Sequence, residues 1–236
     1  SGLIGGAFIP GDAVALLGAD SGEYAGWALD AGDFNGDGVA DAVVGALEPS
    51  YGDAGPGTVY IAYGPLTTSM SLADAEVITG TGGVGGGLGG ALSADCDLDG
   101  DGYGDLVAGA SGVAAGVGEG GAVFLVAGPD VASDKVDHLA FATVMGESKG
   151  QSLGQEVGCG DINGDGLADS MGSFGIPGRS VALWLSPLTG TYHPGDADGV
   201  YWHDSSPLVP AAQSGDIDGD GYRDLLFGAY SASLDD

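Results

Sequence analysis

The sequence predicts an all-β, propeller-like array of about four blades, each with about four antiparallel strands and one acidic loop. Three observations predict this fold class. The same acidic, glycine-containing nonapeptide occurs four times, short runs rich in β-forming residues follow it, and 50 of the 236 residues are glycine. Short β-rich runs bounded by Gly and Pro are typical of strands joined by tight turns. A glycine content far above the usual share favours a turn-dense fold.

The nonapeptide is the most regular part of the repeat. It is DFNGDGVAD at 33–41, DLDGDGYGD at 97–105, DINGDGLAD at 161–169 and DIDGDGYRD at 216–224. The copies begin at residues 33, 97, 161 and 216, so successive copies start 64, 64 and 55 residues apart. Periods somewhat above the usual solenoid length suggest propeller blades or an array. We therefore treat residues 1–236 as one segment of repeated blades.

Each period contains three apolar runs besides the stretch that leads into its loop. Together these give about four strands per period, which matches one propeller blade. The runs directly after the loop are 42–46, 106–110 and 225–229, the second runs are 57–65, 121–129 and 180–187, and the third runs are 13–18, 75–80 and 139–146.

The nonapeptide also has the composition of a calcium-binding loop. Side-chain oxygens at positions 1, 3, 5 and 9, together with the backbone carbonyl at position 7, are what a hard cation such as Ca²⁺ requires. Glycine at position 6 permits the sharp turn, and the side chain at position 7 is expected to be free to vary because only its carbonyl is used. We expect about four Ca²⁺ sites. The predicted ligands are Asp33, Asn35, Asp37, Val39 and Asp41 in the first loop, Asp97, Asp99, Asp101, Tyr103 and Asp105 in the second, Asp161, Asn163, Asp165, Leu167 and Asp169 in the third, and Asp216, Asp218, Asp220, Tyr222 and Asp224 in the fourth.

Two other interpretations of the nonapeptide are weaker. An EF-hand needs a bidentate Glu at position 12 and flanking helices, whereas position 12 is Val44, Ala108, Gly172 and Phe227. A metal-free turn would crowd up to four carboxylates into nine residues, where they repel one another unless a cation binds.

The glycines around the loops extend the pattern. A glycine precedes each of the first three loops by seven residues, at Gly26, Gly90 and Gly154, and Gly-Ala pairs follow at 45–46, 109–110 and 228–229. With the loops, this resembles the FG-GAP repeat of integrin α-subunit propellers and of many bacterial surface proteins. The resemblance implies a calcium-stabilised β-propeller segment with a binding or adhesive role outside the cell. The chain departs from that repeat where Ala25, Gly89 and Leu153 replace the Phe of the first turn, and where Leu47, Ser111 and Tyr230 replace the Pro of the second.

Charge and motifs exclude several function classes. The chain has 4 Lys+Arg against 34 Asp+Glu, for a formal charge of −30, so nucleic acid and anionic membrane surfaces would repel it. No apolar run approaches the ~20 residues that span a bilayer, so we expect no membrane insertion. There is no Cys–His pairing at an evident site, and the metal loops account for the paired carboxylates. We therefore expect no enzymatic activity.

The sequence leaves alternatives open both for the function of the protein and for how its last blade is completed. We expect a calcium-stabilised extracellular or cell-surface module that binds a protein or glycan ligand; loops of this kind fill at extracellular calcium levels. The alternatives are a self-associating fibre or layer subunit completed by strand exchange, or an accessory propeller domain of a secreted hydrolase. The opening run 3–11 resembles a later strand, so it could close a four-blade ring, complete a neighbouring molecule, or belong to a longer propeller. Cys96 and Cys159 could form a disulfide across a repeat boundary or remain two small buried residues.

Overall fold

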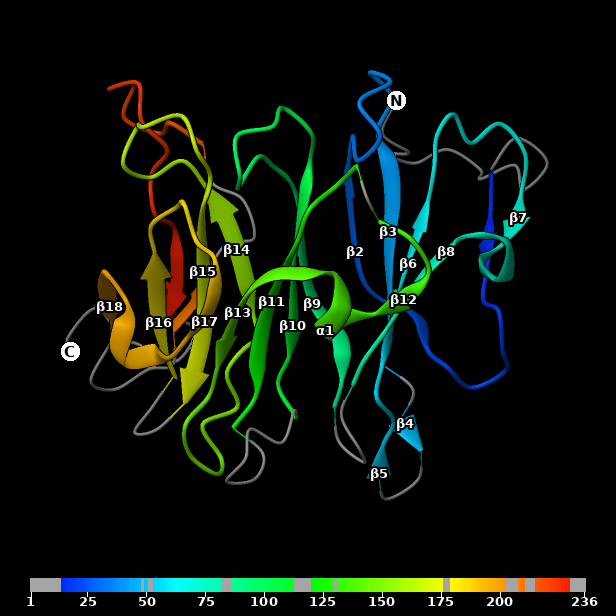
Figure 1. Cartoon of the computed structure of the whole chain (residues 1–236), viewed down its shortest axis with the longest axis horizontal. Helices are drawn as coiled ribbons and strands as arrows, with labels where there is room; N and C mark the ends of the chain where they lie inside the picture. The colour runs from blue at the N-terminus through cyan, green and yellow to red at the C-terminus, as the bar shows by residue number, and fades with distance from the viewer. Residues whose placement is uncertain are drawn as a thin grey trace, which may run out of the picture.

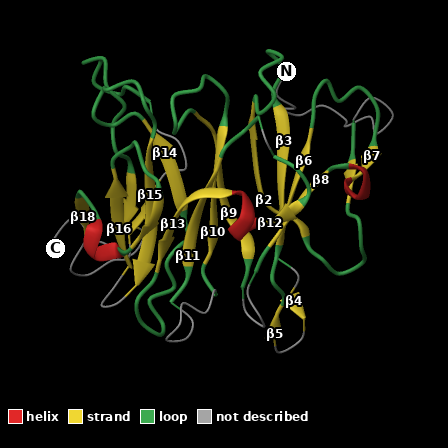
Figure 2. Ribbon diagram, viewed as in Figure 1, coloured by secondary structure: helices red, strands yellow, loops and turns green. Residues whose placement is uncertain are grey.

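The computed structural model describes residues 14–47, 49–50, 53–81, 86–112, 120–129, 131–175, 179–202, 208–210 and 215–229. Within these residues the chain is built almost entirely of strands, with a few short helical turns on the outside (Figure 2). The predicted all-β class is therefore confirmed. The opening run 3–11 lies outside the described residues.

Three larger sheets stand side by side along the longest axis of the molecule (Figure 1). Each contains a four-stranded unit, which we call blades 1, 2 and 3 in chain order, and consecutive members of each unit pair antiparallel. The fourth unit contributes two described strands, not four. Blade 1 is β2 (Ala25–Gly32), β3 (Asp41–Ala46), β6 (Thr58–Ala62) and β8 (Glu76–Thr79); blade 2 is β9 (Leu88–Cys96), β10 (Asp105–Ala110), β11 (Ala122–Val126) and β13 (Ala140–Met145); blade 3 is β14 (Val157–Gly160), β15 (Asp169–Gly175), β16 (Arg179–Trp184) and β18 (Gly199–Tyr201); the fourth unit is β19 (Leu208–Pro210) and β20 (Phe227–Ala229).

Each blade also lends a short strand to the preceding unit. β12 (Asp134–Lys135), between the third and fourth strands of blade 2, pairs parallel with β8 of blade 1. β17 (Gly190–Tyr192), between the third and fourth strands of blade 3, pairs parallel with β13 of blade 2. In blade 1 the equivalent strand β7 (Met70–Ser71) pairs parallel with β1 (Leu16–Leu17). The remaining elements are peripheral: β4 (Pro49–Ser50), β5 (Asp53–Ala54), the single-turn helix α1 (Val136–Leu139) and the 3₁₀ turns Leu72–Asp74 and Pro194–Asp196.

The hydrophobic core lies between the blades. Val43 and Ile61 of blade 1 pack in one cluster with Leu106 and Phe124 of blade 2, and all four are at most 3% exposed. A second cluster joins blades 2 and 3 around the fully buried Trp184. Burial of apolar surface at these two boundaries is the main force that holds the blades face to face.

Paired glycines let neighbouring blades approach closely. A Cβ atom added at Gly45 would collide with the carbonyl oxygen of Gly89 in the next blade, and one added at Gly109 would collide with that of Gly154. Gly89 and Gly154 have φ values of +81° and +85°, which favour glycine. The spacing in the sequence predicts Gly90 as the turn glycine of blade 2, and that prediction is wrong by one residue.

The one-residue shift has a local cause. The pairing of β9 with β10 is interrupted between Cys96 and Ser93, where β9 contains one residue more than its partner. Asp95 lies in this bulge with a φ of +61°. A β-bulge inserts an extra residue into one strand, and here it moves the turn glycine one position further from the loop.

A disulfide joins blades 2 and 3. Cys96, the last residue of β9, is bonded to Cys159 of β14, with 6.2 Å between their Cα atoms. This resolves the two alternatives that the sequence left open. No helix among the described residues is long and apolar enough to cross a membrane.

Candidate metal-binding loops

The four nonapeptides occupy equivalent places in the fold. The loops 33–41, 97–105 and 161–169, here called loops 1, 2 and 3, connect the first and second strands of blades 1, 2 and 3. Loop 4, residues 216–224, lies between β19 and β20 in the same way. We number each loop from position 1, its first Asp, to position 9, its last.

The Asp at position 1 organises each loop by accepting hydrogen bonds from backbone N–H groups that follow it. In every loop one of its carboxylate oxygens accepts from the glycine at position 6, which has a positive φ. Such a bond holds the turn closed and directs the carboxylate toward the inside of the loop. The donors and distances are Gly38 to Asp33, 2.8 Å; Gly102 to Asp97, 3.1 Å; Gly166 to Asp161, 3.0 Å; and Gly221 to Asp216, 2.9 Å.

Positions 3 and 5 are held by the same kind of contact. In loop 2 the N–H of Asp101 donates to Asp99 Oδ1 at 3.1 Å, and the N–H of Tyr103 donates to Asp101 Oδ1 at 2.9 Å. In loop 4 the equivalent bonds of Asp220 and Tyr222 are 3.1 and 2.9 Å long. The side chains predicted as ligands are thus folded over one short stretch of backbone.

Two loops bring three carboxylates close enough to share an ion. One oxygen from each of Asp97, Asp99 and Asp101 lies within 4.8 Å of the others, and the same holds for Asp216, Asp218 and Asp224. Burial raises the pKa of Asp99, and the charges of Asp101 and Asp97 add to this rise, although a backbone hydrogen bond opposes it. A divalent cation would relieve this repulsion, and carboxylate oxygens are the ligands that Ca²⁺ prefers.

Loops 1 and 3 carry an amide at position 3, where loops 2 and 4 carry a fourth carboxylate. The Nδ2 of Asn35 donates to Asp37 Oδ2 at 3.3 Å, and that of Asn163 donates to Asp165 Oδ2 at 2.9 Å. These bonds neutralise part of the repulsion within the loop. Because affinity rises with ligand charge, loops 2 and 4 have the stronger donor sets for a divalent cation.

In loops 1, 2 and 3 the Asp at position 9 is buried and ties the loop to its blade. Asp105 is 0% exposed; its Oδ2 accepts from Leu98 N–H at 2.7 Å and its Oδ1 accepts from Gly128 N–H at 2.9 Å. Asp41 and Asp169 are equally buried and make the equivalent pairs of bonds. Each carboxylate oxygen has a second lone pair, so these bonds leave room for a metal ligand.

Burial makes this position sensitive to a counter-charge. It raises the pKa of Asp105 to about 7, and the negative charges of Asp99 and Asp101 act in the same direction, while the two backbone bonds lower it. Burial also raises the pKa of Asp169. A desolvated carboxylate takes up either a proton or a cation, so the last Asp of the loop favours metal binding at neutral pH.

In loops 2, 3 and 4 the side chain at position 7 contacts the preceding loop, a contact that the sequence did not predict. A Cβ atom added at Gly36 of loop 1 would collide with the ring of Tyr103, which is position 7 of loop 2. Leu167 covers Gly100 in the same way, and Tyr222 covers Gly164. Each of these side chains packs on position 4 of the preceding loop, so the loops form a contiguous row.

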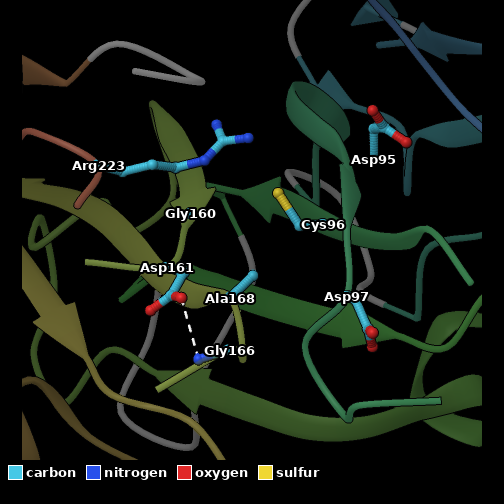
Figure 3. Close-up of a pocket in the computed structure, with 8 residues that line it drawn as sticks. All are labelled: Asp95, Cys96, Asp97, Gly160, Asp161, Gly166, Ala168 and Arg223. Atoms are coloured by element: carbon cyan, nitrogen blue, oxygen red, sulfur yellow. Dashed lines mark hydrogen bonds between the residues drawn. The ribbon is translucent and has the colours of Figure 1, made fainter. Parts of the chain in front are cut away.

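A pocket lies between loops 2 and 3 (Figure 3). Its volume is about 160 Å³, and its lining includes three acidic residues and one cation, Arg223 at position 8 of loop 4. Sequence reasoning missed this arginine, although it is the single charged residue among the four copies of position 8. A Cβ atom added at Gly160 would lie 3.0 Å from Arg223 Cδ, which places the arginine stem over blade 3. The pocket is lined by Asp95, Cys96, Asp97, Gly160, Asp161, Gly166, Ala168 and Arg223.

Comparison with known protein families matches the FG-GAP repeat to residues 25–61 and 88–126. Each matched stretch begins at the first strand of a blade, contains its acidic loop and ends in or after the third strand. The two matches therefore cover the first three strands of blades 1 and 2, where the loop and glycine pattern is most regular. A search of curated proteins finds no match to this chain.

Proposed function

Because residues 25–61 and 88–126 match the FG-GAP repeat, we propose that this chain is a calcium-stabilised extracellular module that binds a protein or glycan ligand and has no catalytic activity. Repeats of this family form propeller modules that are often extracellular and adhesive. The observation that carries the proposal is the repeated loop itself, whose acidic side chains converge over nine residues in equivalent places of the fold.

Calcium in such loops would act as part of the scaffold. With a dissociation constant of roughly 0.1 mM and calcium of a few mM, each occupied site adds about 2 kcal/mol to the free energy of unfolding. Four sites would add about 8 kcal/mol, which is comparable to the whole stability of a typical domain. The metal would therefore stabilise the fold rather than take part in a reaction.

Thermal unfolding with and without calcium tests this role. The protein, freed of metal, is titrated with CaCl₂ by calorimetry, and its melting temperature is recorded at zero and at 5 mM added calcium. We expect about four bound ions and a rise in melting temperature of roughly 15–30 °C. Magnesium at the same concentration is the control, since it demands a tighter octahedral shell. An unchanged melting temperature would contradict the proposal.

Self-association is the second candidate, and exposed apolar residues at both ends of the row favour it. Leu29 and Trp27 of β2 are 68% and 58% exposed at the outer face of blade 1. The equivalent of Leu29 in blade 2 by strand register is Leu92, which is 6% exposed because blade 1 covers it. At the other end, Ile217 is 66% exposed, whereas Phe34 at the same loop position is fully buried.

The two ends thus offer the faces that blades use to pack on one another. Light scattering coupled to size exclusion, over a hundredfold range of concentration in calcium, distinguishes the candidates. A mass that stays at the monomer value favours the ligand-binding module. A mass that increases with concentration in the wild-type protein, but stays at the monomer value in a Leu29→Glu variant, favours self-association.

A further inference from the structure

Neighbouring loops are joined through their backbones. The N–H of Gly104, position 8 of loop 2, donates to the carbonyl oxygen of Asp33, position 1 of loop 1, at 2.9 Å. The N–H of Ala168, position 8 of loop 3, donates to the carbonyl oxygen of Asp97, position 1 of loop 2, at 2.7 Å. The same contact therefore recurs at two successive blade boundaries.

In each of these hydrogen bonds, the donating N–H belongs to a peptide unit whose carbonyl is itself a predicted metal ligand. The planar unit that contains the N–H of Gly104 also contains the carbonyl of Tyr103, and the two point in opposite directions in a trans peptide. Since the N–H points at loop 1, the carbonyl points away from loop 1. This carbonyl is the position-7 ligand predicted for loop 2. The unit formed by Leu167 and Ala168 has the same relation to loops 3 and 2.

Side-chain contacts run parallel to the backbone bonds. Tyr103 lies on Gly36 of loop 1, and Leu167 lies on Gly100 of loop 2. Both glycines have positive φ values, +70° and +83°, in the segment that folds around the predicted ion. A side chain that packs on a glycine restricts its conformational freedom, which is otherwise the largest of any residue.

We propose that calcium binding is positively coupled between adjacent loops, through the peptide units Tyr103–Gly104 and Leu167–Ala168 and the side chains that cover Gly36 and Gly100. This inference rests on the proposed calcium-binding function. A cation held in part by the Tyr103 carbonyl would polarise this peptide and make the Gly104 N–H a stronger donor to the carbonyl oxygen of Asp33, since hydrogen bonds in a chain strengthen one another. It would also hold Tyr103 over Gly36, so loop 1 would lose less entropy when its own ion binds.

Coupling of this kind is reciprocal. Loop 1 should bind calcium more tightly when loop 2 is filled, and loop 2 should respond equally to loop 1. Loop 4 lies next to loop 3 in the row, so disabling it should not affect loop 1. The row therefore predicts which pairs of sites communicate.

A calcium titration followed by ¹H–¹⁵N NMR tests the coupling site by site. The position-6 glycines Gly38, Gly102, Gly166 and Gly221 serve as probes, because each donates to the first Asp of its own loop. The double variant Asp99→Asn/Asp101→Asn disables loop 2 and keeps the buried anchor Asp105. We expect the midpoint reported by Gly38 to move to calcium concentrations at least about fivefold higher, the lower end of usual coupling.

The matched control is Asp218→Asn/Asp220→Asn, which removes the same two charges from loop 4 and should leave the Gly38 midpoint unchanged. A second pair of variants tests the side-chain contacts without changing the charge of any loop. Tyr103→Ala should weaken loop 1, whereas Val39→Ala, the same position in loop 1, should weaken no other loop because Val39 lies against Gly64 of its own blade.

The outcomes are distinguishable. If no glycine probe of the wild-type protein responds to calcium, the proposed function fails and the coupling fails with it. If all probes respond but the Gly38 midpoint is the same in wild type, Asp99→Asn/Asp101→Asn and Tyr103→Ala, calcium binding stands and the coupling is overturned. Equal weakening by the loop 2 and loop 4 variants would also overturn it, since that pattern indicates net charge alone.

Discussion

Cys96 and Cys159 form a disulfide that joins the end of β9 to β14, immediately before the starts of loops 2 and 3. Cys159 Sγ also lies 3.1 Å from the buried Ser93 hydroxyl oxygen. The bond therefore closes 63 residues of sequence at the boundary between two blades, where the loops of both blades are already joined by the hydrogen bond from Ala168 to Asp97.

Removal of this disulfide should lower stability without changing the fold. For a closed segment of this length, the loss of loop-closure entropy in the unfolded chain corresponds to about 4 kcal/mol. We expect the Cys96→Ser/Cys159→Ser variant to lose roughly this amount of free energy of unfolding in urea titrations at saturating calcium. The reduced wild-type protein is the control and should lose a similar amount, since it lacks the same covalent closure. A variant as stable as the oxidised protein would contradict the prediction.

Substitution of Asp105 should destabilise the protein even where calcium is absent. Asp105→Ala leaves the N–H groups of Leu98 and Gly128 without acceptors in a buried place. Each unsatisfied buried donor costs about 1–3 kcal/mol, so we expect a loss of about 2–6 kcal/mol in chemical denaturation. Asp20→Ala, at an exposed position, removes the same charge and should change the free energy of unfolding by less than about 0.5 kcal/mol.

The calcium-free protein should become less stable as pH rises from about 4 to about 7. Burial raises the pKa of folded Asp105 from 3.8 to about 7, so in this window the native state holds a proton that the unfolded state has released. The contribution is fully present below the unfolded pKa and is lost as pH rises through the folded pKa. Melting temperatures of metal-free protein at pH 5 and pH 8 measure it.

Two comparisons isolate the contribution of Asp105. Asp105→Asn should show a smaller fall in melting temperature between pH 5 and pH 8, because this side chain no longer titrates. Saturating calcium should also reduce the fall in the wild-type protein, since the ion takes the place of the proton. An equal fall in wild type and variant would assign the pH dependence to other carboxylates.

Gly109→Ala should weaken the contact between blades 2 and 3. The added Cβ atom would meet the carbonyl oxygen of Gly154, a backbone atom that cannot rotate aside as the end of a flexible side chain can. Forced overpacking of this kind costs about 1–3 kcal/mol. Thermal unfolding should show a lower melting temperature for this variant. Gly195→Ala is the matched control, because a Cβ atom there meets nothing within 4 Å, and it should be neutral or slightly stabilising.

The sequence predicted those features that depend on residue order over short distances. The loops 33–41, 97–105, 161–169 and 216–224 recur with the same positions, so each could be recognised as a turn that gathers oxygens. Runs such as 42–46 and 106–110 became β3 and β10 because β-branched residues such as the Val residues in both runs favour strands. The fourth unit was harder to anticipate, since its repeat is less regular and only β19 and β20 are described.

Contacts between blades were decided by the tertiary structure. The sequence alone left the Cys96–Cys159 bond open and placed the turn glycine at Gly90, because a bulge at Asp95 cannot be seen in a repeat spacing. It also left position 7 without a role, although Tyr103 packs on the preceding loop. A short motif specifies its own oxygens through local backbone geometry. Which neighbour those oxygens and side chains meet depends on how burial of apolar surface aligns one blade against the next.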